Sequence, residues 1–231
     1  MKHEVLHAPA FSTLRLDLDQ GECVHSQPGA MQAMTPGFDI DVKMGMQMKG
    51  RRPGVFGGFR SMFGGESFFR VLYTAKRDAQ YIMLAPEQMG DIRVVEVTPE
   101  SGLLLASGAF LACTPDLSFD LHYGGVKGML ATRGLFFLKT QGRGTLFLSS
   151  YGGVIEQTLA EGERFVLDNR NLVSFSQGMA FESVVLTRSV KDSFFSGEGF
   201  VVRFTGPGKV IYQTRARPSA GLIRGLIQSI T

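Results

Sequence analysis

Two sequence elements recur three times in this chain of 231 residues, and their order constrains the fold more than any other feature. The first element predicts a strand, a turn and a second strand, in "GESFFRVLYTAKRDAQYIMLAP", "RGLFFLKTQGRGTLFLSS" and "GEGFVVRFTGPGKVIYQT". The second element precedes each copy of the first. It consists of an alternating strand, a glycine turn, a short apolar strand, and a phenylalanine followed by an acid. Ordered recurrence of this kind is the signature of a repeat protein.

The repeats predict an all-β protein. Residues about 10–90, 91–152 and 153–216 form three tandem β-sandwich-like units, and together they make a single β domain over 1–217. Units of this size do not each bury a full core, so we expect them to pack together around a pseudo-threefold axis. Residues 40–49 alternate apolar and polar with period two, which is typical of a strand with one apolar face.

The tail, residues 218–231, differs from the repeats. Leu222, Ile223, Leu226, Ile227 and Ile230 share one helical face, so the tail is predicted to be a short amphipathic helix. It would pack on the body of the protein, lie at a subunit interface or dock on a membrane.

Basic residues concentrate in two stretches of the chain. Residues 42–65 contain five basic residues and no acid, and residues 199–231 contain another five and again no acid. Such stretches indicate an anionic partner, and the alternative interpretation is a solvated rim. The candidate docking residues on this hypothesis are Lys49, Arg51, Arg52, Phe56, Phe59, Arg60, Arg217 and Arg224.

The repeats also align acids with bases. Asp39, Asp120 and Glu182 follow the recurrent phenylalanine, and Arg70, Lys139 and Arg203 lie at similar places in the other element. We expect ion pairs between neighbouring repeats or exposed side chains at these positions. Glu66 and Glu198, next to the recurrent strand starts, are further candidates.

The sequence excludes several classes of site. No P-loop, nucleophile elbow or zincin motif occurs, so we expect no enzyme and no cofactor. Asp17 with Asp19, and Asp39 with Asp41, place two carboxylates on one strand face. Each pair could hold a hard cation or simply belong to a polar outer face. Two cysteines, no secretory signal and no apolar run near the length of a membrane span favour a cytoplasmic location.

The segments "GGFRSMFGGESFF", "GLFFLKTQGRGTLFLSSYGG" and "SGEGFVVRFTGPGKVIYQTR" resemble the altered-inheritance-of-mitochondria (mitochondrial biogenesis) family over nearly the whole chain. The resemblance implies a bacterial-type member, a fold like that of the tryptophan RNA-binding attenuation protein, and a homotrimer. It implies no catalytic motif.

These observations favour a non-enzymatic oligomeric scaffold that docks on a membrane surface or an acidic protein partner. On this hypothesis the protein is cytoplasmic, and attachment to the periphery of the inner membrane is the alternative location. The alternatives are a nucleic-acid-binding protein, suggested by the likeness in fold, and a protein that binds a small ligand between repeats.

Overall fold

The computed structural model describes residues 1–44, 69–123, 136–185 and 200–216. Nearly all of these residues lie in or between β-strands, and the all-β prediction is confirmed. The predicted tail helix, 218–231, lies outside the described residues.

Each unit contributes six strands, and β1 (Lys2–Leu6) precedes the first unit. The first unit contains β2 (Thr13–Leu18), β3 (Cys23–Ser26), β4 (Met31–Met34), β5 (Phe38–Met44), β6 (Phe69–Ala75) and β7 (Gln80–Leu84). The second contains β8 (Ile92–Val97), β9 (Leu103–Leu105), β10 (Phe110–Cys113), β11 (Leu117–Tyr123), β12 (Phe136–Gly142) and β13 (Gly144–Ser149). The third contains β14 (Val154–Leu159), β15 (Arg164–Asp168), β16 (Leu172–Ser176), β17 (Ala180–Val185), β18 (Phe200–Thr205) and β19 (Gly208–Gln213), with a short 3₁₀ helix at Asn169–Asn171.

The strands form four antiparallel sheets. The first has the order β1-β2-β7-β4 and the second the order β5-β6-β3-β10-β13-β8. The third has the order β11-β12-β9-β16-β19-β14 and the fourth the order β15-β18-β17. Every unit therefore places its first, third and sixth strands in one sheet and its second, fourth and fifth strands in the next.

Three hydrophobic cores lie between the four sheets. The first core joins Leu14 and Leu16 of β2 to Tyr73 of β6 and Phe147 of β13, so it fills the space between the first and second sheets. The second core lies between the second and third sheets, and the third between the third and fourth. Each core draws on residues of two units, so neighbouring units depend on one another for a complete core. Truncation of a fully buried leucine such as Leu16 to alanine should cost about 2–5 kcal/mol.

The third strand of each unit carries the same irregularity. The register shifts between Met31 and Ala33 in β4, between Phe110 and Ala112 in β10, and between Leu172 and Ser174 in β16. β-bulges recur at fixed positions within a family of structures. The shared bulge aligns Met34, Cys113 and Phe175 as equivalent residues of the three units.

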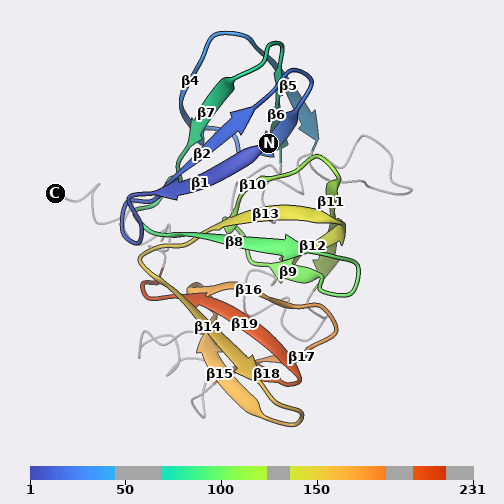
Figure 1. The fold of residues 1–231 in the computed structure, drawn as a ribbon. Coiled ribbons are helices and arrows are strands. Elements are labelled where there is room, and N and C mark those ends of the chain that lie inside the picture. The colour runs from blue at the N-terminus through green and yellow to red at the C-terminus, as the bar shows by residue number, and fades with distance from the viewer. Residues whose placement is uncertain (45–68, 124–135, 186–199, 217–231) are drawn as a thin grey trace, which may run out of the picture.

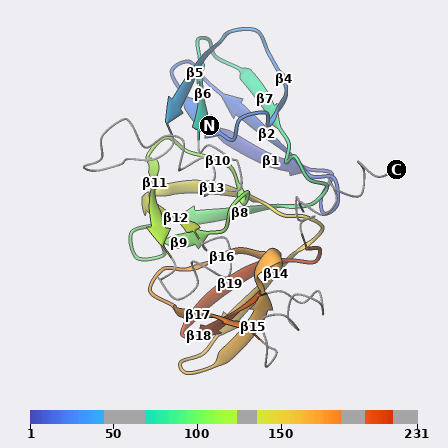
Figure 2. The same ribbon diagram turned by 180° about the vertical axis from the view of Figure 1, so that it is seen from behind.

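The units follow one another in an open stack, and this differs from the expected pseudo-threefold packing. Figures 1 and 2 place the first and third units at opposite ends of the molecule, with the second between them. In a closed arrangement β15 would pair with β4, whereas among the described strands β15 neighbours β18 and β4 neighbours β7. Among the described strands, the hydrogen bonds at each junction join successive units only, so no described strand pairing closes the stack.

Candidate functional site

The fourth and fifth strands of each unit form a hairpin whose two strands end at equivalent points. The last described pairs are Met44 with Phe69, Tyr123 with Phe136, and Val185 with Phe200. The connections 45–68, 124–135 and 186–199 therefore link the same two strands in all three units. Figures 1 and 2 both place β5, β11 and β17 along the same side of the stack.

These ends correct the expected alignment of the acids. Counting back along each hairpin, the residue equivalent to Asp120 and Glu182 is Asp41, not Asp39. The residue equivalent to Lys139 and Arg203 is Leu72, not Arg70. The motif "FDID" contains two acids, Asp39 and Asp41, whose side chains point to the same face of the strand. Only the strand pairing shows which of them is equivalent to Asp120 and Glu182.

The ion pairs of the predicted residues lie within units, so the expectation of pairs between repeats is wrong for them. Arg203 Nη1 lies 2.7 Å from Glu182 Oε1, and both belong to the third unit. Asp39 pairs with Lys76 of its own unit at 2.5 Å. Asp120 lies opposite Lys139 and accepts a hydrogen bond from the Gln141 side chain. Exposed pairs of this kind typically contribute about 0–1 kcal/mol.

Arg70 does connect two units, though not through an acid. Its side chain is buried between the second and third sheets, where Nη1 donates a 3.0 Å hydrogen bond to the carbonyl oxygen of Leu117. The guanidinium also lies over the ring of Phe119, at 5.5 Å from its centroid. Glu66 and Glu198, the other predicted partners, lie outside the described residues.

An ion pair between units occurs at residues that the sequence did not single out. Arg93 of β8 lies 2.5 Å from Glu156 of β14, and Lys209 of β19 holds the same carboxylate at 3.0 Å. Burial opposes ionisation of Glu156, but hydrogen bonds and charge from Lys209 and Arg93 outweigh it and lower the carboxyl pKa. No local signal joins residues so far apart in sequence, so only the fold reveals this contact.

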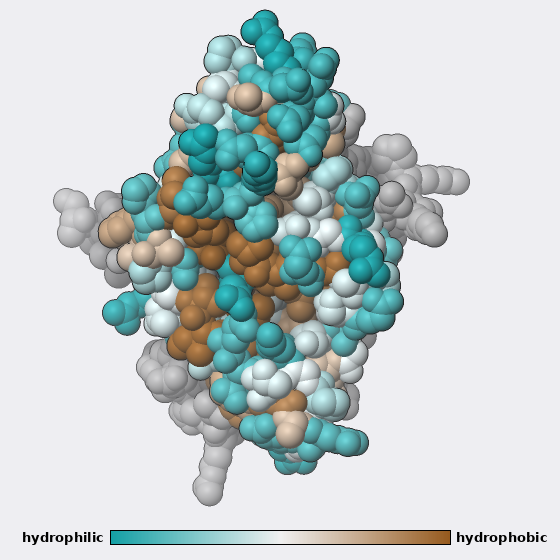
Figure 3. Space-filling model, viewed as in Figure 1, coloured by the Kyte–Doolittle hydropathy of each residue, from teal (hydrophilic) through white to brown (hydrophobic). Residues whose placement is uncertain are grey.

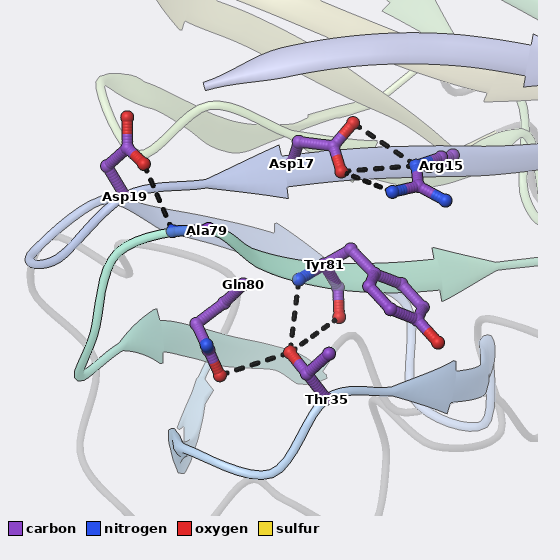
Figure 4. A network of polar contacts seen from close by, with 7 residues as sticks. All are labelled: Arg15, Asp17, Asp19, Thr35, Ala79, Gln80 and Tyr81. Atoms are coloured by element: carbon purple, nitrogen blue, oxygen red, sulfur yellow. Dashed lines mark hydrogen bonds and ion pairs between the residues drawn. The ribbon is translucent and has the colours of Figure 1, made fainter.

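Two of the carboxylates considered for a cation, those of Asp17 and Asp19, are engaged by protein groups, as Figure 4 shows. Arg15 Nη2 donates to Asp17 Oδ1 at 2.7 Å, and Asp19 Oδ1 accepts from the backbone N–H of Ala79 at 3.2 Å. Close by, Thr35, which directly follows β4, donates through Oγ1 to Gln80 Oε1 of β7 at 3.0 Å. Among the described residues, no three His, Cys, Asp or Glu side chains are grouped so that they could hold a metal ion.

Cys113 is a buried thiol in the second core. Burial raises the pKa of Cys113 to about 12, although the nearby positive charge of Arg70 acts in the opposite direction. Cys23 is half-buried, and burial also raises its pKa. Thiols in such surroundings are poor nucleophiles near neutral pH.

All eight predicted docking residues lie outside the described part of the chain: Lys49, Arg51, Arg52, Phe56, Phe59, Arg60, Arg217 and Arg224. What the structure does fix is where the first basic stretch joins the body, at the ends of β5 and β6.

Figure 3 shows a second surface feature, a gathering of apolar side chains across the middle of one face, around β8 and the start of β14. Its partly exposed members on these strands are Val94, Val95, Val154 and Ile155. β8 and β14 lie at the sheet edges opposite β5 and β11. This apolar patch is therefore separate from the side that carries the long connections.

Comparison with known proteins identifies the family. The model of the family described as "Mitochondrial biogenesis AIM24" matches residues 3–215. The chain belongs to the AIM24 family. The resemblance noted in the three repeat segments is thereby confirmed, and it extends through all three units of the stack.

Two relatives from Streptococcus pyogenes illustrate the similarity. An uncharacterised AIM24-family relative from serotype M6 is 28% identical over 218 residues, which cover 93% of this chain and 86% of the relative. A crystal structure of a Streptococcus pyogenes protein superimposes with a TM-score of 0.74 at 26% identity, covering 100% of this chain and 99% of the other. Neither relative has a named activity. Within the described residues, no helix has the length and apolar character to cross a membrane.

Proposed function

We propose that this AIM24-family protein is a non-enzymatic scaffold that docks on an anionic surface, with a membrane as the first surface to test. The observation that carries the proposal is the common side of the stack from which all three long connections start. An anionic membrane attracts basic segments electrostatically and accepts apolar side chains at its interface.

The composition of the three connections supports this proposal. Together they contain eight basic residues, four in 45–68, two in 124–135 and two in 186–199, against three acids, Glu66, Asp192 and Glu198. Their net charge is therefore +5, whereas the rest of the chain, with 16 basic and 18 acidic residues, has −2. The fold thus gathers the starting points of the basic segments on one side of a body that is slightly acidic.

Flotation with liposomes containing phosphatidylserine tests the proposal. The intact protein should float at low salt and should float less as the salt concentration rises, because salt screens the attraction. Arg51→Glu with Arg52→Glu should abolish flotation. Arg77→Glu with Arg143→Glu is the matched control, since it changes the charge equally at the turns that follow β6 and β12, away from the connections.

The outcomes separate the alternatives. No flotation of the intact protein at low salt would reject the membrane version. An equal loss of flotation in both double variants would mean that net charge, and not the position of the basic residues, causes the binding. A third outcome is that the intact protein binds single-stranded RNA but not liposomes, and that the Arg51/Arg52 double variant loses RNA binding. This outcome would favour nucleic-acid binding over docking on a membrane.

A further inference from the structure

The first core has a cover at one side that the second core lacks. β1 lies at the outer edge of the first sheet, and its residue Val5, together with Met1, packs against the first core. The ring of His3, also on β1, lies 5.3 Å from the ring of Phe147 in the second sheet, measured between centroids. Because Phe147 is paired with Val94 of β8, β1 closes the gap between the first and second sheets beside β8.

The gap between the second and third sheets is bordered on this side by two edge strands, β8 and β14. Val95 of β8 and Val154 of β14 pack against the second core but are only partly buried. Arg93 and Glu156 bridge the two strands through their ion pair. These four residues form an open rim of the second core, within the apolar area of Figure 3. Among the described strands, none pairs with the outer edge of β8 or of β14.

The other two members of the apolar patch face different cores. Val94 lies opposite Phe147 of the first core, and Ile155 lies opposite Tyr212, which packs against the third core. Successive side chains of a strand point to opposite faces. Ile155 therefore points away from the open rim, although it directly follows Val154.

The chain leaves the described part of the structure at this rim. The backbone N–H of Thr214 donates to the carbonyl oxygen of Gly153 at 3.0 Å, and Thr214 Oγ1 accepts from the N–H of Gly153 at 2.9 Å. Gly153 directly precedes Val154, and the description of the chain ends at Ala216. The remaining residues, 217–231, therefore start beside the rim.

We propose that the C-terminal tail of the same chain, residues 218–231, packs its apolar side on the open rim and closes the second core as β1 closes the first. The tail carries one apolar helical face, made of Leu222, Ile223, Leu226, Ile227 and Ile230. Stacked sheets lie about 10 Å apart and a helix with its side chains is about 10–12 Å across, so one helix fits over the gap between β8 and β14. Residues 217–221 span up to about 20 Å when extended, so the apolar face reaches the rim.

The tail needs a surface of this kind to form a helix. Isolated helices shorter than about 12–15 residues are marginal in water, and Gly221 and Gly225 weaken this one further. Tethering beside the rim gives the tail an effective concentration there of about millimolar, which favours it over a separate partner. Tail docking does not depend on the proposed membrane contact, because the long connections lie on the other side of the stack.

Tryptophan fluorescence of the full chain tests the proposal. The sequence contains no tryptophan, so Leu226→Trp places a single reporter on the apolar face of the tail. This variant should emit at a shorter wavelength when folded than when unfolded in urea, because the indole is buried against the rim. Gln228→Trp is the matched control on the polar face of the tail, and it should emit like an exposed indole in both states.

Substitutions at the rim identify the surface that the tail covers. In the Leu226→Trp chain, Val154→Asp should shift the emission to longer wavelengths. Val95→Thr, which nearly keeps the shape of the side chain, should give a smaller shift in the same direction, and it decides the matter if Val154→Asp does not fold. Ile155→Asp is the control on the next residue of β14 and should leave the emission unchanged, since Ile155 faces the third core.

Three results would each overturn the proposal. The first is emission typical of an exposed indole from the folded Leu226→Trp chain. The second is a short-wavelength emission that the folded rim variants leave unchanged, because the tail would then be buried on another surface. The third is a shift to longer wavelengths on dilution, because the tail of another copy would then be the occupant. Circular dichroism establishes folding of each variant.

Discussion

At the scale of single residues, the side chains that hold units together are those whose neighbours are distant in sequence. Arg70 was expected to face an acid, yet it is buried and donates to the carbonyl oxygen of Leu117. The alternating pattern of β6 predicts a strand but does not tell which sheet covers a given face. A charged side chain that is buried under the next sheet needs a hydrogen-bond acceptor close to it in space. For Arg70 this acceptor is a backbone carbonyl oxygen.

Arg70→Met should destabilise the protein. The substitution keeps much of the apolar volume, but it removes the buried hydrogen bond from Arg70 to the carbonyl oxygen of Leu117. We expect the free energy of unfolding in urea to fall by about 1–3 kcal/mol. Arg77→Met, at an exposed turn, is the control and should change it by less than about 0.5 kcal/mol. Equal small effects would mean that the buried contact contributes nothing.

Glu156 makes stability depend on pH in the acid range. Its pKa is lowered in the folded protein, so the ion pair with Arg93 and Lys209 stabilises above the unfolded pKa of about 4.3 and is lost as the pH falls through the folded value. Glu156→Gln should unfold with a shallower pH dependence below about pH 4.5 than the unaltered protein. The loss at neutral pH should be about 1 kcal/mol or less, because Arg93 and Lys209 are half-exposed. Chemical denaturation at several pH values measures both, and parallel pH profiles would contradict the assignment.

At the scale of elements, turn geometry determines where each hairpin ends. The turn between β12 and β13 places Gly142 at φ 92°, where a Cβ would lie 2.4 Å from the carbonyl oxygen of Asp116. Gly162, in the turn before β15, has φ 74° with nothing within 4 Å of a Cβ. Both glycines are in the left-handed region, but only at Gly142 would an added Cβ also clash with the backbone of another residue.

Gly142→Ala should therefore cost more than Gly162→Ala. Left-handed strain alone costs about 1 kcal/mol for a residue with a side chain, and we expect this for Gly162→Ala. Gly142→Ala adds a steric conflict with backbone and should reach about 3 kcal/mol or more. Thermal unfolding of both variants tests the ranking, and equal costs would show that the β12–β13 turn relaxes freely.

At the scale of the whole molecule, stability should depend on assembly. If the chain forms the homotrimer that the family resemblance implies, the folded state is favoured by mass action, and Tm should rise with protein concentration. Val166→Asp, at an exposed position of the edge strand β15, should have a lower Tm that does not change with concentration, while Ile155→Asp, at an exposed position of β14, should follow the unaltered protein. A Tm independent of concentration for all three proteins would argue that assembly does not stabilise the fold.

The sequence by itself determined the class of the fold. The recurring strand, turn and strand segments and the period-two alternation predict an all-β repeat protein, and the structure and the AIM24 family match confirm both the class and the family. These features are local, since periodicity and turn residues act over a few neighbouring positions.

Only the tertiary structure decided how the units meet. The sequence comparison matched Asp39 to Asp120 and Glu182, and it suggested a closed arrangement of units. Strand pairing shows instead that Asp41 is the equivalent residue and that each unit divides its strands between two sheets. The physical reason is that register and sheet membership depend on hydrogen bonds and burial between residues well separated in sequence, from 19 positions for Asp120 with Lys139 to 86 positions for Ser26 with Ala112. Local patterns in the sequence do not encode these contacts, so the division of each unit between two sheets becomes visible only in the folded chain.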